Sequence, residues 1–358
     1  MAVSERAGSV NRIREHRVHA PGMKSIAFWL LPAVVSLAWA QSKDRGGTRP
    51  PDPRNRYSTA LAGPSLGFVF DPVSKSVRPL LGLAGAAMRG APLKVPFALD
   101  RAEAAQRGAF VLGIDQADSA VIAITTAGAQ KLSGVSAAPD TVVFSPSASA
   151  AALYHRDRAV VEILEGLPGR AALAASLNVA ALPQSVTALA VSDDGLVLAA
   201  SPTGPETVVV YAVGRHRAAA PVLTVEGVAG MTFLGSSEDA LVADGAANLV
   251  YRLRDGAAPV VIAGVGEGIS TPIGLAASAD GKRAMVANDG GAPLVLLDLV
   301  NRSASKASCP CRVSAAEPMA GNAVFRVTAD SEPVMWILDA DLPAPRFLFV
   351  PAAEARRP

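Results

Sequence analysis

The sequence predicts an all-β protein built as a single β-propeller. Half of the 358 residues are hydrophobic and 18% are charged, and glycine (31) and proline (27) are frequent. Short runs rich in valine, leucine and alanine alternate with turn residues, which is typical of strands. These runs recur at a fixed spacing, and a small sheet of this kind buries both of its faces only when several sheets stack around an axis.

The repeat is clearest in the second half of the chain. The turn glycines Gly195 and Gly281 lie 86 residues apart, which is two periods of 43. Each follows an aspartate, and Asp-Gly accepts the positive φ angles of a tight hairpin turn. Equivalent strand, turn, strand, loop, strand patterns occupy residues 190–213, 231–253 and 277–299.

The number of blades is predicted from the complete units and from the two chain ends. Five complete units begin near residues 94, 139, 184, 229 and 273. The remaining strand candidates are 67–71 and 76–81 at the start of the chain and 322–327, 334–338 and 346–350 at its end. A blade that combined first and last strands would close the ring without an open edge, so we expect six four-stranded blades closed in this way. Seven blades are the alternative, because the two ends together offer five strands.

One repeat unit also supports a family resemblance. Its sequence, PIGLAASADGKRAMVAND, starts at residue 272. It resembles the blade repeat of secreted bacterial propellers of the YVTN and NHL types, in which P-x-G-[IVL]-A precedes a D-G turn and V-A-[ND]. As an architecture the resemblance covers roughly residues 64–352. It implies a fold and leaves the activity open, because such propellers include lactonases, lyases, cofactor enzymes and plain binding scaffolds.

The first 40 residues read as a signal peptide region. Lys24 precedes the apolar run 26–40, which ends in Ala-Trp-Ala, and this order is typical of a cleaved secretory signal. Met23 is an alternative start of translation. The apolar run is shorter than the roughly 20 residues that span a bilayer, so we expect no stable membrane insertion after cleavage and a secreted or periplasmic protein.

The rest of the chain divides simply. Residues 41–63 are polar and contain three prolines, so they are expected to be a flexible lead-in. The propeller is expected over 64–352, and 353–358 form a short tail.

The charge balance excludes one class of partner. Residues 1–40 hold five of the 33 basic and two of the 31 acidic residues, which leaves 28 basic and 29 acidic residues after cleavage. With no basic excess and few aromatic residues, nucleic-acid binding is not expected.

Candidate ligand-binding residues follow the second strand of each blade, where the loops of one propeller face surround the channel mouth. Carboxylate, amide and imidazole groups there could hold calcium, another divalent cation or a polar ligand. Aspartate and asparagine are also common at such positions because they cap turns, which is the alternative. The candidates are Asp115, His155, Asp244, Asn288, Asp289 and Asp339, and Ser201 occupies the same position in the unit that begins near residue 184.

Two further patterns bear on catalysis. His155 is followed by Asp157, which could orient it, but a nucleophilic serine on a strand-to-helix elbow is not expected in a chain of short strands. Glu267 and Glu317 are the glutamates best placed to complete a metal site. We expect no cofactor, with a divalent cation as the alternative.

Cys309 and Cys311 are the only cysteines. In an oxidising compartment they could form a local disulfide, and as thiolates they could bind a soft metal. The intervening proline favours a turn and therefore the disulfide.

Two functions follow from these expectations. The first is a monomeric, non-catalytic propeller that binds a protein, peptide or polysaccharide segment. The alternative is a cation-dependent enzyme of lactonase or lyase type with its site at the channel mouth.

Overall fold

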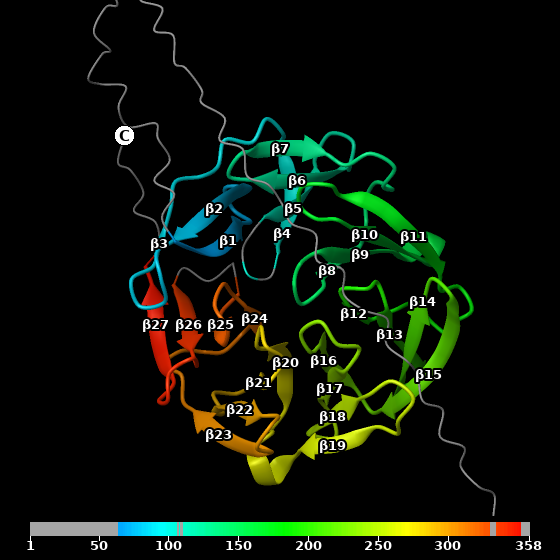
Figure 1. Ribbon diagram of the computed structural model, residues 1–358, viewed down its shortest axis with the longest axis vertical. Helices are drawn as coiled ribbons and strands as arrows, with labels where there is room; N and C mark the ends of the chain where they lie inside the picture. The colour runs from blue at the N-terminus through cyan, green and yellow to red at the C-terminus, as the bar shows by residue number, and fades with distance from the viewer. Residues whose placement is uncertain (1–63, 106, 108–109, 330–333, 352–358) are drawn as a thin grey trace, which may run out of the picture. The chain divides into compact units, whose positions relative to one another are not determined.

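The computed structural model describes residues 64–105, 107, 110–329 and 334–351. These residues form 27 strands in seven sheets, which follow one another around a ring in chain order (Figure 1). We number the sheets 1 to 7 in that order. The chain is therefore a seven-bladed β-propeller, with four strands in every blade except the first, which has three.

The first four sheets come from residues 65–225. Their strands are β1 (Ser65–Asp71), β2 (Ser76–Leu81) and β3 (Met88–Arg89); β4 (Leu99–Ala104), β5 (Val111–Asp115), β6 (Val121–Thr125) and β7 (Gly128–Lys131); β8 (Thr141–Phe144), β9 (Ala150–His155), β10 (Val160–Glu165) and β11 (Ala172–Asn178); β12 (Ala188–Val191), β13 (Val197–Gly204), β14 (Thr207–Gly214) and β15 (Arg217–Val225).

The last three sheets come from residues 228–350, and two single-turn 3₁₀ helices, Arg156–Arg158 and Val265–Glu267, lie in the connections. The strands are β16 (Val228–Phe233), β17 (Ala240–Asp244), β18 (Leu249–Leu253) and β19 (Val260–Ala263); β20 (Pro272–Ala277), β21 (Arg283–Asn288), β22 (Leu294–Asp298) and β23 (Ser303–Ala307); β24 (Glu317–Pro318), β25 (Val324–Arg326), β26 (Met335–Asp339) and β27 (Arg346–Val350).

Each sheet is an antiparallel meander whose first strand lies innermost. First strands of neighbouring sheets approach one another, as β12, β16 and β20 do, and so form the wall of the central channel. The predicted hairpin turns are present: Gly195 has φ +78° and Gly281 has φ +65°. At Gly281 a Cβ atom would also meet the Leu234 backbone at 3.1 Å, so both conformation and space favour glycine there.

The hydrophobic core is divided among the interfaces between neighbouring sheets. Seven clusters of buried residues correspond to the seven interfaces of the ring. Between sheets 2 and 3, for example, the rings of Phe110 and Phe144 meet edge to face at 5.5 Å. The small side chains of the second strands, such as Ala150–Ala152, are fully buried and allow the sheets to stack closely.

The ring closes between sheets 1 and 7 by side-chain packing and a backbone hydrogen bond. Leu66 and Leu80 of sheet 1 are buried against Ile337 and Val350 of sheet 7, and the Ala320 N–H donates a hydrogen bond to the Leu66 carbonyl. Among the described residues no sheet combines strands from the two ends. The expected six blades with a shared closing blade are therefore wrong, and the alternative of seven is confirmed.

The miscount has a local cause. Sheets 1 and 7 each contain a two-residue strand, β3 and β24, which is too short for an alternating pattern of apolar and polar residues. Without these two strands the sequence offers five strands at its ends, which were assigned to one blade.

The described strands extend from Ser65 to Val350, within the predicted propeller region. The predictions for residues 1–40, 41–63 and 353–358 lie outside the described residues. In the part of the chain that the structure describes, no helix has the length and apolar character needed to cross a membrane.

Candidate functional site

Buried polar side chains lie at the end of the second strand in sheets 2, 3, 5 and 6, and Ser201 lies three residues before the end of that strand in sheet 4. Sheet 7 has Thr328 at the corresponding place, two residues beyond β25. All six side chains are buried at one end of the ring, where the second strands stop: Asp115, His155, Ser201, Asp244, Asn288 and Thr328.

In sheets 4 to 6 these side chains are held by the backbone of the connection that enters the first strand. The Asp244 carboxylate accepts hydrogen bonds from the N–H groups of Glu226 and Gly227 at 3.0 and 3.1 Å, and from Ala246 and Ala247 at 3.2 and 3.1 Å. The structure therefore gives Asp244 four internal partners, as expected of a turn-capping residue.

Asn288 and Ser201 make equivalent contacts. The Asn288 amide accepts from the Ser270 N–H at 3.1 Å and donates to the carbonyls of Gly268 and Pro293 at 2.9 and 2.8 Å. The Ser201 hydroxyl donates to the Gln184 carbonyl at 2.8 Å and accepts from its N–H at 3.0 Å. These groups connect each blade to the chain of the preceding one.

Asp115 forms an ion pair instead of hydrogen bonds to the connection that enters its sheet. Its Oδ2 lies 2.7 Å from Lys131 Nζ, which also contacts Asp118 at 2.6 Å and lies 5.4 Å from the centre of the Phe97 ring. A second contact, from the Ala117 N–H to Asp115 Oδ1 at 3.2 Å, caps the loop after β5.

His155 faces Glu162 rather than the expected Asp157. His155 Nε2 lies 3.5 Å from Glu162 Oε2, and the same carboxylate accepts from the N–H of Ser136 at 2.9 Å and from its hydroxyl. Burial, together with the positive charge of Arg158, lowers the pKa of His155. The serine is bonded to the glutamate and not to the imidazole, so the order needed for a Ser-His nucleophile is absent from this group.

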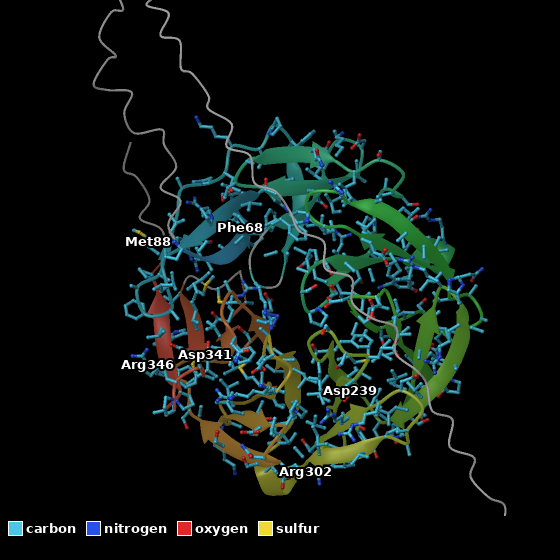
Figure 2. All side chains as sticks on the ribbon, in the orientation of Figure 1. Phe68, Met88, Asp239, Arg302, Asp341 and Arg346 are labelled. Atoms are coloured by element: carbon cyan, nitrogen blue, oxygen red, sulfur yellow. A yellow bond between two sulfur atoms is a disulfide. The ribbon has the colours of Figure 1, made fainter. Side chains whose placement is uncertain are left out.

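Asp289 and Asp339 lie apart from these side chains. Asp289 is exposed in the loop after β21. Asp339 ends β26, the third strand of sheet 7, so it lies at the opposite end of the ring from the second-strand ends. There its Oδ2 lies 3.4 Å from Arg346 Nη2, and Figure 2 labels Arg346 and Asp341 around this turn. The prediction that Asp339 follows a second strand is wrong because β24 was missed, which shifted the strand count by one.

The described residues include no group of three or more histidine, cysteine, aspartate or glutamate side chains that could hold a metal ion. A calcium site needs six to eight oxygen ligands, and the oxygens of Asp244 and Asn288 already accept backbone hydrogen bonds. The sequence-based candidates were predicted to bind a cation or a polar molecule, and this stays a prediction for all six: Asp115, His155, Asp244, Asn288, Asp289 and Asp339.

The central channel contains a different group of charged residues. A cavity of about 210 Å³ is bounded by the inner strands β1, β4, β8 and β24 and by β25. Its charged lining consists of Glu103, Arg107, Glu317 and Arg326. Four of the seven blades therefore enclose one mixed-charge site near the ring closure.

Within this cavity the charges differ in how they are paired. Glu317 and Arg326 lie opposite each other in the β24–β25 pair and form an ion pair. Arg107 Nη1 donates to the Pro146 carbonyl at 2.7 Å. For Glu103 the structure gives no hydrogen bond or ion pair to any described residue.

The environment of Glu103 changes its acidity. Its side chain is open to the channel, but the surrounding walls limit its hydration. Burial, followed by the negative charge of Glu317, raises the pKa of Glu103 to about 7, while Arg326 and Arg101 act in the opposite direction. A carboxyl that is half protonated near neutral pH, within a cavity, is a common feature of functional sites.

The channel site was only partly predicted. Glu317 was noted as a metal-site candidate, and the structure places it on the channel wall beside Arg326. Glu103 was missed, although its strand, Leu-Asp-Arg-Ala-Glu-Ala, is the one inner strand of sheets 2 to 6 that contains charged residues. That contrast was the available signal.

Other cavities lie away from the ring closure, and two of them also carry four or five charged side chains. A pocket of about 90 Å³ on the side of sheets 3 to 5 is lined by apolar residues and Thr232. A larger groove of about 310 Å³ lies between sheets 5 and 6 at the rim, where Val260 and Val261 are 57% and 50% exposed. Its arginines include Arg252, which is engaged by Asp239 at 2.6 Å. We place the candidate site in the channel, because four blades contribute to that cavity and Glu103 in its lining has a raised pKa.

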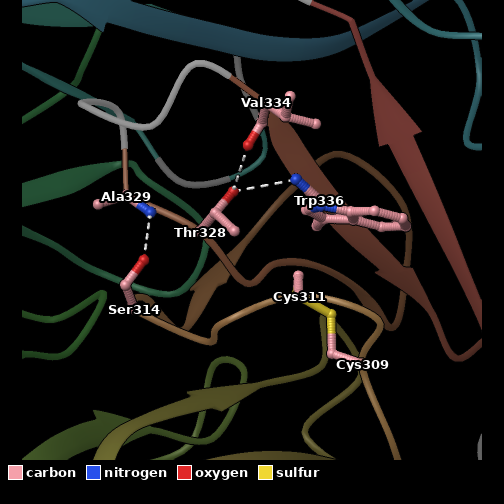
Figure 3. Close-up of a disulfide and its surroundings, with 7 residues drawn as sticks. All are labelled: Cys309, Cys311, Ser314, Thr328, Ala329, Val334 and Trp336. Carbon is pink, nitrogen blue, oxygen red and sulfur yellow. Dashed lines mark hydrogen bonds between the residues drawn. A yellow bond between two sulfur atoms is a disulfide. The ribbon is translucent and has the colours of Figure 1, made fainter. Parts of the chain in front are cut away.

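The two cysteines form the disulfide and lie in the connection between β23 and β24 (Figure 3). Both side chains pack partly against the core between sheets 6 and 7, next to Trp336. Thr328 bridges the nearby loop, accepting from the Trp336 N–H at 2.9 Å. Of the two alternatives for Cys309 and Cys311, the structure has the disulfide.

Comparison with known proteins identifies the fold and no family. No family model matches the chain, and no curated protein matches it. A functionally unknown protein from Desulfotomaculum acetoxidans is similar in structure, with a TM-score of 0.53, 11% identity, and coverage of 81% of this chain and 100% of that one. Hsv2 from Kluyveromyces marxianus has a TM-score of 0.50, 9% identity, and coverage of 80% and 98%.

A streptogramin B lyase structure has a TM-score of 0.48 and 12% identity, and covers 69% of this chain and 80% of its own. At this level of similarity it carries no argument about activity. These comparisons and the seven sheets together define the class of the protein, a β-propeller, and the fold alone does not assign a function.

Proposed function

We propose that this protein is a non-catalytic β-propeller located outside the cytoplasm, which binds a segment of protein, peptide or polysaccharide in its central channel. The observation that carries the proposal is the cavity of about 210 Å³ lined by Glu103, Arg107, Glu317 and Arg326. A concave site with a few converging polar groups is the usual form of a ligand pocket.

The location rests on two further observations. The N-terminal sequence has the order of a secretory signal, and the Cys309–Cys311 disulfide is of the kind that persists in oxidising compartments. The resemblance of one blade to YVTN and NHL repeats is consistent with a secreted bacterial propeller. Membership of that group is part of the proposal.

Binding can be tested by thermal shift with trilysine, triglutamate, trialanine, maltotriose and calcium chloride as probes. A ligand that binds the folded state raises Tm in a saturable way. We expect at least one organic probe to do so in the wild-type protein, and Glu103→Trp to abolish the shift by filling the cavity.

Glu206→Trp is the matched control, because Glu206 is exposed in the loop between β13 and β14. Its shift should equal that of the wild type. If no probe stabilises the protein, or if Glu103→Trp binds as well as Glu206→Trp, the channel is not the binding site.

A cation-dependent enzyme of lactonase or lyase type is the second candidate. One observation favours catalysis: the pKa of Glu103 is about 7, which suits a general acid or base. Turnover of a panel of lactones that requires calcium and is lost in Glu103→Gln would favour this candidate over the binding protein.

A further inference from the structure

Among the described residues of the channel cavity, one carboxyl group has no hydrogen bond or ion pair. Glu317 pairs with Arg326, Arg101 Nη1 donates to the Asp140 carbonyl at 2.8 Å, and Arg107 Nη1 donates to the Pro146 carbonyl while its Nε has no described partner. Glu103 is therefore the carboxylate of the cavity that is most available to a ligand.

Arg101 and Asp140 are the other charged residues beside Glu103, and both already have hydrogen-bond partners. A side pocket of about 100 Å³ beside Glu103 is lined by Arg101 and Asp140. The Asp140 carboxylate accepts from the Arg156 N–H at 2.7 Å. Among the described residues that line the cavity, two carboxylates (Glu103 and Glu317) lie with two guanidinium groups (Arg107 and Arg326), and Glu103 is the carboxylate for which no ion pair is formed with a described residue.

We propose that the ligand of the channel supplies an ammonium group, such as a lysine side chain of a peptide, which binds between the carboxylates of Glu103 and Glu317. This inference rests on the proposed binding function and names the ligand chemistry of the same site. A compact ammonium donates up to three hydrogen bonds, so one group can contact both carboxylates.

A divalent cation is a weaker occupant for the same site. Calcium takes six to eight oxygens, and the described residues around the channel include no group of three metal-binding side chains. An ammonium is satisfied by two carboxylates and nearby carbonyls.

Binding of a cation should be linked to loss of a proton. Glu103 has a pKa of about 7 in the free protein, and a positive charge beside it favours the ionised form. Near pH 7 about half a proton should leave on binding, and the apparent affinity should follow the ionised fraction of Glu103. Between pH 8 and pH 6 that fraction falls about tenfold, and so should the affinity.

Isothermal titration of the full chain with trilysine tests this inference. Titrations at pH 6, 7 and 8, each in two buffers of different ionisation enthalpy, give both Kd and the number of protons released. We expect an approximately tenfold weaker Kd at pH 6 than at pH 8. Trialanine and triglutamate should bind more weakly than trilysine at pH 8.

Two variants separate the roles of the site. Glu103→Gln keeps the shape of the side chain, so it should bind trilysine at least about tenfold more weakly at pH 8 and without pH dependence. Glu206→Gln, a change of the same kind on the exposed loop after β13, should behave as the wild type.

The outcomes distinguish the inference from the function on which it rests. Trilysine binding that is independent of pH and unchanged in Glu103→Gln would overturn the inference. So would saturable binding of triglutamate, maltotriose or calcium that Glu103→Trp blocks while trilysine does not bind, although the channel would still be a binding site. If none of these probes binds, both the inference and the proposed function fail.

Discussion

Glu317 and Arg326 lie directly opposite each other on the antiparallel strands β24 and β25 and form an ion pair on the wall of the central channel. The Arg326 side chain is 8% exposed and that of Glu317 is 50% exposed, so the pair links the channel surface to the interior of sheet 7. Burial and the negative charge of Glu317 raise the pKa of Glu103, which lines the same cavity. The following predictions test this arrangement and the fold that supports it.

Removing the charge of Glu317 should make Glu103 more acidic. In Glu317→Gln the pKa of Glu103 should fall from about 7 but stay above its ordinary value, because burial is the larger cause of the shift. A pH titration of ¹³C-labelled glutamate side chains by NMR measures this change. An unchanged pKa of Glu103 would show that the two carboxylates do not interact.

Glu103 should make the stability of the protein depend on pH. Its ordinary pKa is 4.5 and its pKa in the folded protein is about 7, so between these values the folded state binds the extra proton. This group therefore opposes folding increasingly as pH rises from about 4.5 to 7, and adds no such cost below that range.

The comparison of Glu103→Gln with the wild type isolates this effect. The variant should gain stability relative to the wild type as pH rises above about 5 and the gain should level off above about 8. Urea unfolding at pH 4, 5.5, 7 and 8.5 gives the difference, with Glu206→Gln as the control that follows the wild type. A difference that is constant over this range would contradict the raised pKa.

Asp244 should be a stabilising residue. It is 1% exposed and accepts four backbone hydrogen bonds, so Asp244→Ala leaves several buried N–H groups without acceptors. We expect a loss of about 3 kcal/mol in the free energy of unfolding.

Asp289→Ala is the matched control, because Asp289 is exposed at the next position of a neighbouring blade. It should change stability by no more than about 0.5 kcal/mol. Equal effects of the two substitutions in urea unfolding would mean that the hydrogen bonds accepted by Asp244 do not stabilise the fold.

Closure of the ring should depend on the interface between sheets 1 and 7. Ile337 is fully buried there, so Ile337→Ala should cost about 2–5 kcal/mol. Ile273, at 39% exposed on an inner strand, provides the control, and Ile273→Ala should cost less than about 1 kcal/mol. A small loss for Ile337→Ala would argue against closure by packing of these two sheets.

The disulfide should contribute modestly to stability. It closes a loop of three residues, Cys309 to Cys311, for which the chain-entropy relation gives about 1.5 kcal/mol. Urea unfolding with and without reductant measures the contribution, and thiol titration should find no free thiol before reduction. Two free thiols in the purified protein would contradict the bond.

The repeated middle of the chain was predictable because its strands are long enough to show a pattern. The units that begin near residues 94 to 273 correspond to sheets 2 to 6, and Gly195 and Gly281 have the positive φ that the Asp-Gly turns predicted. The ends were miscounted because β3 and β24 have two residues each. Asp339 was misplaced for the same reason.

The candidate site was less predictable than the fold. The ends of the second strands were found from local sequence in sheets 2 to 6, but the hydrogen bonds that occupy Asp244 and Asn288 come from connections about 20 residues away in the sequence. The importance of Glu103 depends on Glu317, which lies more than 200 residues later and meets it only because the ring closes. No local pattern contains that information.

Titration of the Glu103 carboxyl by ¹³C NMR tests the central claim most directly, with Glu103→Gln used to assign the resonance. The account predicts a midpoint of about 7 in the free protein and a clear decrease when trilysine is added. A midpoint near 4.5, unaffected by trilysine, would show that Glu103 is an ordinary solvated carboxylate and that the channel is not the site described here.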